Sequence, residues 1–342
     1  MNSRDIFIGL GNPRQESATR FIRQCICYAS GQAQVLVSTL NPKSKVMKRS
    51  ITSDWKRLLP ALYVSLVVIV VLWMMPRNAR AQLYVGNATG FGGGVVSKYS
   101  AKTGHVINAN FITGLSNPPL ALAVEDNTLF VSDHDSIGKY DATTGAVIKK
   151  DFFTGLRIII AFVLILPKKD TGISLAQDGV IWEVVDGIGL PDFITGLDQP
   201  SGLAVFGSAE KAVLFVTDRN EEGRGTVGEY DANTGVTINR HFITGLMGPT
   251  GLAVRGNTLF VANTSSGTVG KYDATTGGAV NAGFVTGLEK PNGLAVRENT
   301  LFVASAGGHK VGAYDATTGA VINARFITGL TQAVGIAVKS AK

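Results

Sequence analysis

The sequence predicts an all-β protein, a six-bladed β-propeller made of four-stranded antiparallel blades. Three observations lead to this prediction: an internal repeat of about 42 residues, four short apolar segments in each repeat, and a composition rich in glycine and poor in charge. Glycine contributes 41 of the 342 residues, and charged residues make up 17%. Such a glycine content would be costly in a helical bundle. The low charge argues against a disordered chain.

The repeat is marked by the string Phe-Ile-Thr-Gly-Leu and its variants, which begin at intervals of 41, 41, 49, 42 and 42 residues. The six copies begin at Phe111, Phe152, Phe193, Phe242, Phe284 and Phe326. Three further strings recur between them: Tyr-Asp-Ala-Thr-Thr-Gly, Gly-Leu-Ala-Val and Leu-Phe-Val. In 251–285 the apolar segments are separated by Gly, Asn or Asp, which is typical of an antiparallel meander. Six such units over residues 82–342 predict the propeller.

The repeated residues have structural explanations. We expect the Asp of each Tyr-Asp-Ala-Thr-Thr-Gly turn to accept backbone N–H groups and the Gly to supply a positive φ. The Gly and Ala of Gly-Leu-Ala-Val suit an inner strand, where neighbouring blades converge. The Phe and Leu of Phe-Ile-Thr-Gly-Leu are expected to fill the space between blades.

The two ends of the repeat region are complementary fragments of one blade. Residue 82 begins at a second strand, whereas 335–338 is a first strand. We therefore predict that 335–338 joins the blade of Leu83, Val95 and Tyr99 and so closes the ring, which removes exposed strand edges.

One repeat departs from the pattern. Residues 157–192 have the right length but lack three of the four strings. They are interpreted either as a divergent blade, with Val180 to Val184 replacing the Tyr strand, or as the product of a short compensated reading-frame error.

The N-terminal part of the sequence predicts where the protein is located. Residues 58–75 form a long apolar run after a basic flank, and Ala79-Arg80-Ala81 follows as a small-x-small site. We interpret 47–81 as a signal peptide, with an uncleaved membrane anchor as the alternative. Met47 is the expected initiator, which makes 1–46 a spurious or disordered extension. A secreted, periplasmic or cell-surface protein is predicted, or a single-pass anchored one if 58–75 is retained.

The charge distribution excludes one class of partner. The net charge is +7, but residues 1–81 hold 12 Lys/Arg and 3 Asp/Glu, and residues 82–342 hold 20 and 22. The repeat region is therefore nearly neutral, and a phosphate-binding groove for nucleic acid is not indicated. Both cysteines, Cys25 and Cys27, lie before the repeats, so disulfides and thiolate metal sites are not available to them.

The repeats resemble a known family. Pro291-Asn292-Gly293-Leu294-Ala295-Val296, followed by Leu301-Phe302-Val303-Ala304 and Gly308-His309-Lys310-Val311, is similar to the NHL repeat, and the resemblance covers essentially all of 82–342. The resemblance implies a propeller but leaves function open, because NHL-type propellers include protein-binding, RNA-binding and enzymatic members. The leading hypothesis is a secreted, monomeric binding module for a protein, peptide or glycan. The alternative is a propeller enzyme of the lactonase or streptogramin-lyase kind, with a divalent metal at the channel mouth.

Candidate binding residues lie on the face that carries the second-to-third-strand loops and the blade-to-blade linkers, since loops vary while strands hold them. The fourth repeat is longest and has a charged insertion there. The candidates are Asp133, His134, Asp135, Asp218, Arg219, Glu221, Glu222, Arg224 and His309. We predict no catalytic set and no resident cofactor. The acidic loops leave a divalent cation such as Ca²⁺ or Mg²⁺ open, although they lack EF-hand spacing.

Overall fold

The computed structural model describes residues 27–29, 32–34, 81–89, 92–155, 159–164, 171–176 and 181–339. The chain divides into two compact units, Met1–Leu72 and Trp73–Lys342. In the first unit, β1 (Cys27–Ala29) and β2 (Gln32–Gln34) pair antiparallel. The predicted signal or anchor segment, 58–75, lies outside the described residues. Among the residues that are described, no helix is long and apolar enough to cross a membrane.

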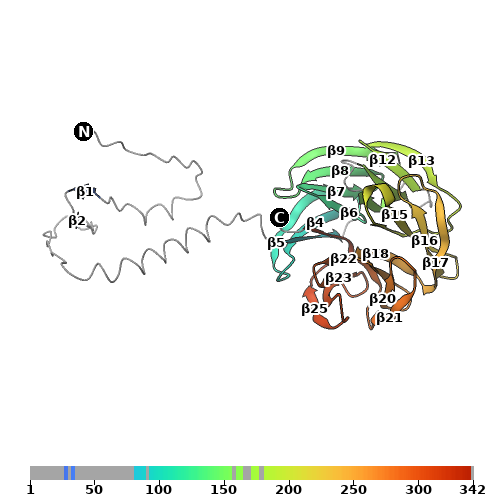
Figure 1. The fold of residues 1–342 in the computed structure, drawn as a ribbon. Coiled ribbons are helices and arrows are strands. Elements are labelled where there is room, and N and C mark those ends of the chain that lie inside the picture. Colours follow the sequence, from blue (N-terminus) through green and yellow to red (C-terminus); the bar gives the residue numbers. More distant parts are fainter. Residues whose placement is uncertain are drawn as a thin grey trace. The chain divides into compact units, whose positions relative to one another are not determined.

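The second unit is a β-propeller, as predicted, and its blades are four-stranded antiparallel sheets (Figure 1). The described residues contain six of these sheets. Blade 1 contains β26 (Ala333–Lys339), β3 (Gln82–Ala88), β4 (Gly94–Ser100) and β5 (Val106–Leu115). Blade 2 contains β6 (Leu122–Glu125), β7 (Thr128–Asp133), β8 (Ser136–Asp141) and β9 (Val147–Thr154).

The other blades follow in chain order. Blade 3 contains β10 (Ile159–Leu164), β11 (Thr171–Ala176), β12 (Ile181–Val185) and β13 (Ile188–Ile194). Blade 4 contains β14 (Gly202–Phe206), a 3₁₀ turn η2 (Ala209–Lys211), β15 (Val213–Arg219), β16 (Arg224–Asp231) and β17 (Thr237–Met247). Blade 5 contains β18 (Pro249–Arg255), β19 (Thr258–Asn263), β20 (Thr268–Asp273) and β21 (Ala279–Val285). Blade 6 contains β22 (Pro291–Arg297), β23 (Thr300–Ser305), β24 (Lys310–Asp315) and β25 (Val321–Ile327).

The C-terminal strand closes the ring. Strand β26 pairs antiparallel with β3, with Val338 opposite Leu83 and Ile336 opposite Val85. The predicted closure is therefore confirmed: blade 1 combines one strand from the C-terminal end of the repeats with three from their N-terminal end. Buried Ala333, Val334 and Ala337 fix the strand in place.

The apolar core is divided among the blade interfaces. Each of the six buried clusters in the described residues combines side chains of two adjacent blades. Phe111 of blade 1, for example, packs with Leu129 of blade 2, and its ring centroid lies 5.6 Å from that of Tyr84. The expectation that Phe and Leu of Phe-Ile-Thr-Gly-Leu fill the space between blades is confirmed, because Leu115 belongs to the same cluster.

Two constraints require glycine at the end of each third-to-fourth-strand turn, namely a positive φ and a close contact with the preceding blade. Gly145 has φ +80°, and a Cβ placed on it would lie 2.4 Å from the carbonyl oxygen of Phe111 in the preceding blade. The same arrangement recurs at all six interfaces, including Gly104 of blade 1 against Phe326 of blade 6. The other four are Gly187 against Phe152, Gly235 against Phe193, Gly277 against Phe242 and Gly319 against Phe284. The turn and the interface therefore require the same residue.

The inner strands approach one another equally closely. A Cβ placed on Gly202 would lie 1.9 Å from the Thr250 carbonyl oxygen, and one on Gly251 would lie 2.0 Å from that of Asn292. Gly293 approaches Val334 in the same way, at 2.4 Å. The expectation that Gly-Leu-Ala-Val strands lie where space is tight is confirmed.

The divergent repeat folds as a blade. Strands β10–β13 form one antiparallel sheet, and β12 takes the place of the Tyr strand. Its turn keeps Asp186-Gly187, and Gly187 meets the preceding Phe152 like its equivalents. The residues that this blade retains are thus those that the blade interface uses.

The outer strands carry a bulge set by asparagine. Asn108 Oδ1 accepts the N–H of Asn110 at 3.0 Å, and Asn323 Oδ1 accepts that of Arg325 at 2.9 Å. The pairing register shifts beside both asparagines, between Lys98 and Tyr99 and between Ala313 and Tyr314. A bulge distorts an edge strand, which makes it a poor template for pairing with another chain.

A buried lysine joins blade 1 to blade 2. Lys98, 3% exposed, donates from Nζ to the carbonyl oxygens of Ala142 and Thr143, both at 2.9 Å. Its ammonium also lies 4.5 Å from the Phe111 ring centroid. Burial lowers the pKa of Lys98 to about 8, nearby Lys339 lowers it further, and Asp141 opposes them.

We predict that Gly277→Ala destabilises the protein by about 1–3 kcal/mol more than Gly287→Ala does. Both glycines have φ +72°, so the backbone cost is shared. Only Gly277 has a neighbour in the way, the Phe242 carbonyl oxygen at 2.2 Å from a Cβ, whereas nothing lies within 4 Å at Gly287. Urea unfolding of the two variants measures the difference. Equal losses in the free energy of unfolding would show that Gly277 is needed for the turn conformation but not for the contact between blades.

We predict that Lys98 makes stability rise with pH above 8. The folded pKa of about 8 lies below the 10.5 of an unperturbed lysine, so between these values the unfolded chain binds more protons. The free energy of unfolding of the wild type, minus that of Lys98→Met, should therefore increase from pH 8 to pH 10 by up to ~1.4 kcal/mol per pH unit. Lys102→Met, at an exposed turn lysine, controls for the change in net charge. A pH-independent difference would contradict the assignment.

Candidate functional site

The candidate site is the loop face, defined here by the second-to-third-strand turns and the blade-to-blade linkers. It surrounds one end of a channel between the inner strands. A cavity of about 290 Å³ in this channel is lined by residues of β6, β10, β14, β18, β22 and β26. Blades 4, 5, 6 and 1 contribute only residues near the start of the inner strand, such as Ser201, Gly251, Asn292 and Val334, whereas β6 and β10 line the cavity over most of their length. The cavity therefore reaches the loop-face end of the channel and extends along the inner strands of blades 2 and 3.

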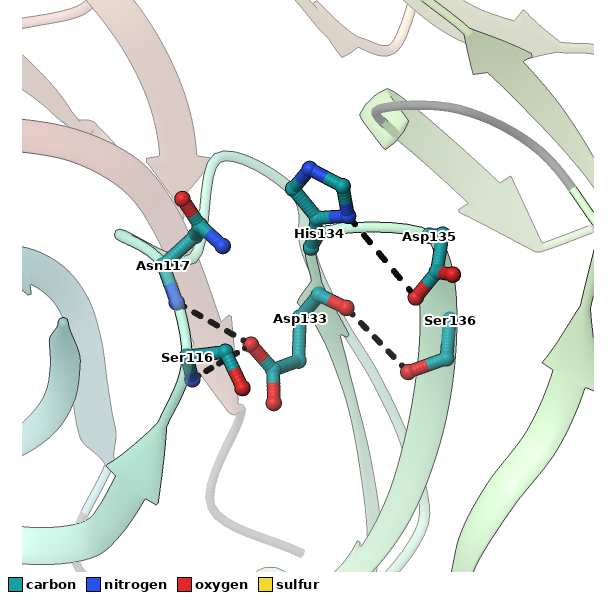
Figure 2. A network of polar contacts seen from close by, with 6 residues as sticks. All are labelled: Ser116, Asn117, Asp133, His134, Asp135 and Ser136. Atoms are coloured by element: carbon teal, nitrogen blue, oxygen red, sulfur yellow. Dashed lines mark hydrogen bonds and ion pairs between the residues drawn. The ribbon is translucent and has the colours of Figure 1, made fainter. Parts of the chain in front are cut away.

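The Asp133 carboxylate accepts hydrogen bonds from the backbone of the linker between blades 1 and 2. Asp133 ends β7, and its Oδ1 accepts the N–H of Ser116 at 2.7 Å and that of Asn117 at 3.2 Å, as Figure 2 shows. Ser116 and Asn117 belong to the linker from blade 1 to blade 2. The carboxylate of Asp133 thus satisfies backbone groups of the linker that precedes its own blade.

His134 and Asp135 form the tip of the same turn. His134 has φ +57°, a conformation that costs a side chain other than glycine some strain. Its Nδ1 lies 3.9 Å from Asp135 Oδ1, and the two side chains are 47% and 63% exposed. Figure 2 shows the imidazole rising from the turn above Asp133. Both side chains are accessible to a partner.

Asp218 occupies the same position in blade 4 as Asp133 in blade 2. Its Oδ1 accepts the N–H of Asp198 at 3.0 Å and that of Gln199 at 2.9 Å, in the linker from blade 3. Burial raises the pKa of Asp218, and the two backbone N–H groups act against this rise. In blade 1, Oδ1 of Asn87 likewise accepts the N–H of a linker residue, Gln332, at 2.9 Å. The fifth residue of the Leu-Phe-Val strand is therefore a linker acceptor in these three blades.

The insertion of blade 4 extends a hairpin. Strands β15 and β16 stay paired as far as Arg219 opposite Gly225. Asn220 then closes the turn, because its N–H donates to the Arg224 carbonyl oxygen at 2.8 Å and its Oδ1 accepts the Arg224 N–H at 2.9 Å. Glu221, Glu222 and Arg224 are exposed, while Arg219 is half-buried. The predicted charged loop is thus a hydrogen-bonded hairpin end that presents Glu221, Glu222 and Arg224 to solvent.

His309 is attached to the linker that closes the ring. It has φ +51°, and its Nδ1 lies 2.5 Å from the Thr331 carbonyl oxygen. The linker that contains Thr331 leads into β26. This contact gives His309 a structural partner.

The candidate residues thus form three separate groups, on blades 2, 4 and 6. Each group bonds to its own blade or to an adjoining linker, and within the described residues no hydrogen bond or ion pair joins one group to another. Nor do the described residues hold a group of three or more His, Cys, Asp or Glu that could bind a metal ion. The arrangement offers separate contact points around a channel.

A line of hydroxyl groups near the channel was not predicted. Ser201 Oγ donates to the Pro249 carbonyl oxygen at 2.9 Å and lies 3.1 Å from Thr217 Oγ1. Thr250 Oγ1 lies 2.9 Å from Thr264 Oγ1. The sequence does contain a sign of these hydroxyl groups. The residue directly before each Gly-Leu-Ala-Val string or its variant differs from blade to blade, and in two blades it is Ser or Thr. These residues are Leu120, Ser201, Thr250, Asn292 and Val334.

We predict that Asp133→Ala destabilises the protein by about 1–2 kcal/mol, because two linker N–H groups lose their acceptor. Asp133→Asn should stay within ~0.5 kcal/mol of the wild type, since an Asn serves at the same position in blade 1. His134→Ala and Asp135→Ala, at the exposed tip, are the controls and should be nearly neutral. Thermal and urea unfolding give the ranking. A loss for Asp135→Ala as large as that for Asp133→Ala would contradict it.

The comparisons with known proteins agree on the fold. A family model described as outer membrane protein assembly factor BamB matches residues 223–323, which is 101 of the 342 residues. No curated protein matches the chain.

Among the solved structures that are similar to this chain are the following two. The "Crystal structure of Nidogen/Laminin Complex" superposes with a TM-score of 0.66 at 16% identity, over 77% of this chain and 99% of that chain. A computationally designed protein, Ika8, gives a TM-score of 0.45 at 19% identity, over 74% of each chain. The nidogen/laminin likeness supports the β-propeller architecture, and the BamB match lies within blades 4 to 6.

Proposed function

We propose that this protein is a secreted or cell-envelope NHL-like propeller that binds a protein, peptide or glycan on its loop face. One observation carries the proposal: the β15–β16 hairpin extends further than those of blades 2, 5 and 6, and it presents Glu221, Glu222 and Arg224 to solvent. The repeat unit has no need of this extension, because blades 5 and 6 form their interfaces without it. Insertions in repeat proteins commonly map to the binding face.

The scaffold suits recognition. Asp133 and Asp218 fix the linkers, so the exposed tips beside them are held on a rigid frame. His134 and Asp135 on blade 2 and the hairpin charges on blade 4 lie on the same face, and the residues that line the cavity are all uncharged. A neutral centre within a polar rim is the usual anatomy of a protein interface.

The comparisons support the same class of function. The matching family model is named for an assembly factor of the outer membrane, which fits an interaction role outside the cytoplasm. The apolar segment 58–75, followed by Ala79-Arg80-Ala81, supports export as well.

The test replaces Glu221, Glu222 and Arg224 by alanine and keeps Asp218, which holds the linker. A control variant replaces Asp151, Glu210 and Lys211, which are exposed away from the loop face and give the same change in net charge. Pull-downs from a cell-envelope extract compare both with the wild type. We expect the hairpin variant to lose a captured component that the control retains, about tenfold or more, given that charged interface contacts contribute on the order of 2 kcal/mol. Undiminished capture by a normally folded hairpin variant would remove the hairpin from the site.

A further inference from the structure

At two blade interfaces, a lysine ammonium binds the third-to-fourth-strand turn of the next blade. Lys98 Nζ donates to the carbonyl oxygens of Ala142 and Thr143, both at 2.9 Å. Lys271 Nζ of blade 5 donates to the equivalent two carbonyl oxygens of blade 6, at 3.5 and 3.0 Å. We call these oxygens, from the two residues after the turn aspartate, the carbonyl pair. At both interfaces the carbonyl pair binds a cation.

Blade 4 has a glutamate at the position of this lysine. Glu229 lies opposite Asn239 of the outer strand, as Lys98 and Lys271 lie opposite the asparagines of theirs. Burial raises the pKa of Glu229, and no hydrogen bond or cation of the described residues opposes the rise. A carboxylate therefore replaces an ammonium at the interface between blades 4 and 5.

The carbonyl pair itself is preserved in blade 5. The Ala274 N–H donates to the Asn257 carbonyl oxygen at 3.0 Å, as the Ala142 N–H donates to that of Asn127 at 2.8 Å. The carbonyl oxygens of Ala274 and Thr275 therefore face the interface as those of the other turns do. Ala274 is only 1% exposed, and no group in the described part of the chain donates to its carbonyl oxygen. A buried acceptor without a partner is costly.

A second cation is also missing from this interface. The inner strand ends with Lys339 in blade 1 and Arg255 in blade 5, and each acts electrostatically on the turn aspartate of the next blade. Blade 4 has Phe206 at this position. Of the described lysines and arginines, none acts on Asp273, the turn aspartate of blade 5. The interface thus combines two carboxylates, those of Glu229 and Asp273, with neither of the usual cations.

We propose that the interface between blades 4 and 5 binds a calcium ion. Its protein ligands are the Glu229 carboxylate and the carbonyl oxygens of Ala274 and Thr275, and water completes the coordination. Calcium takes about six to eight oxygen ligands, which include carboxylates, backbone carbonyl groups and water. Asp273 contributes charge but is not a ligand, because its carboxylate already accepts hydrogen bonds within its own turn and from Asn257.

Two observations point to the ion independently of the acidic side chains. The same backbone oxygens bind an ammonium group at two other interfaces, and the buried Ala274 carbonyl oxygen lacks a donor. The charge of a divalent ion also balances the two carboxylates. The ion would join blade 4 to blade 5 as a lysine joins the other blades. The site lies at a third-to-fourth-strand turn, away from the loop face, so the inference does not depend on the proposed function.

The experiment uses the full chain after removal of metal ions with a chelator. CaCl₂ is titrated while Tm is measured, and NaCl at matched ionic strength is the reference. We expect calcium to raise Tm with a half-maximal effect near 0.1–1 mM, roughly the affinity of extracellular calcium modules, because an ion that binds only the folded state stabilises it. In ¹⁵N spectra the amide resonances of Ala274 and Thr275 should shift with calcium. Those of Ala142 and Ala316, in turns that bind a lysine, should not.

Three variants test the role of Glu229. Glu229→Gln keeps the shape but removes the charge, and should weaken calcium binding at least about tenfold. Glu229→Lys supplies the ammonium found in blades 1 and 5, and should raise Tm without calcium and abolish the response to it. Glu222→Gln makes the same change as Glu229→Gln in the exposed hairpin, and should leave the response intact.

Several outcomes would overturn the proposal. One is a rise in Tm no larger than that in NaCl, and another is a calcium shift that leaves Ala274 and Thr275 unmoved. An unchanged response of Glu229→Gln would also do so, and a response lost only in Glu222→Gln would assign calcium to the hairpin. The wild-type spectra decide even if a Glu229 variant fails to fold.

Discussion

The contact on which the propeller depends is the one between a turn glycine and the carbonyl oxygen of a phenylalanine in the preceding blade. It recurs at six interfaces, and in each the glycine also has positive φ. A side chain at this point would push two blades apart at the rim. Because neighbouring inner strands also meet at glycines in several blades, the spacing between those blades is fixed near the axis as well as at the rim. Buried aromatic and aliphatic side chains fill the wedge between these two contacts.

The same constraint explains how much of the fold could be predicted from the sequence. Interface residues must be the same in every blade, so they appear as a repeat, and the repeat predicts the strand order. The closing strand was predictable because 335–338 and Leu83 belong to different parts of one unit. Blade 3 was harder to interpret, since its inner strand is apolar throughout. Its interface signal was preserved only in Asp186-Gly187 and in the string that begins at Phe193.

The candidate site was predicted less well, for a physical reason. The sequence alone does not distinguish a loop carboxylate that binds a ligand from one that accepts a backbone N–H. Asp133 and Asp218 proved to hold linkers, and they could have been aligned with Asn87, an amide that accepts the same kind of bond. His309 likewise contacts a linker. Asn292, which lines the cavity, was not predicted because the residue directly before each Gly-Leu-Ala-Val string differs between blades and so is not part of the repeat.

Ring closure by β26 also has a consequence for how the chain folds during synthesis. Strands β3 and β26 pair across almost the whole length of the repeat region. Among the strand pairings of the described residues, this one therefore has the highest cost in loop-closure entropy. Blades 2 to 6 can form from neighbouring segments as they leave the ribosome. Blade 1 stays one strand short, with the edge of β3 uncovered, until β26 has been synthesised. An unfinished chain therefore exposes a strand edge at which another nascent chain could pair.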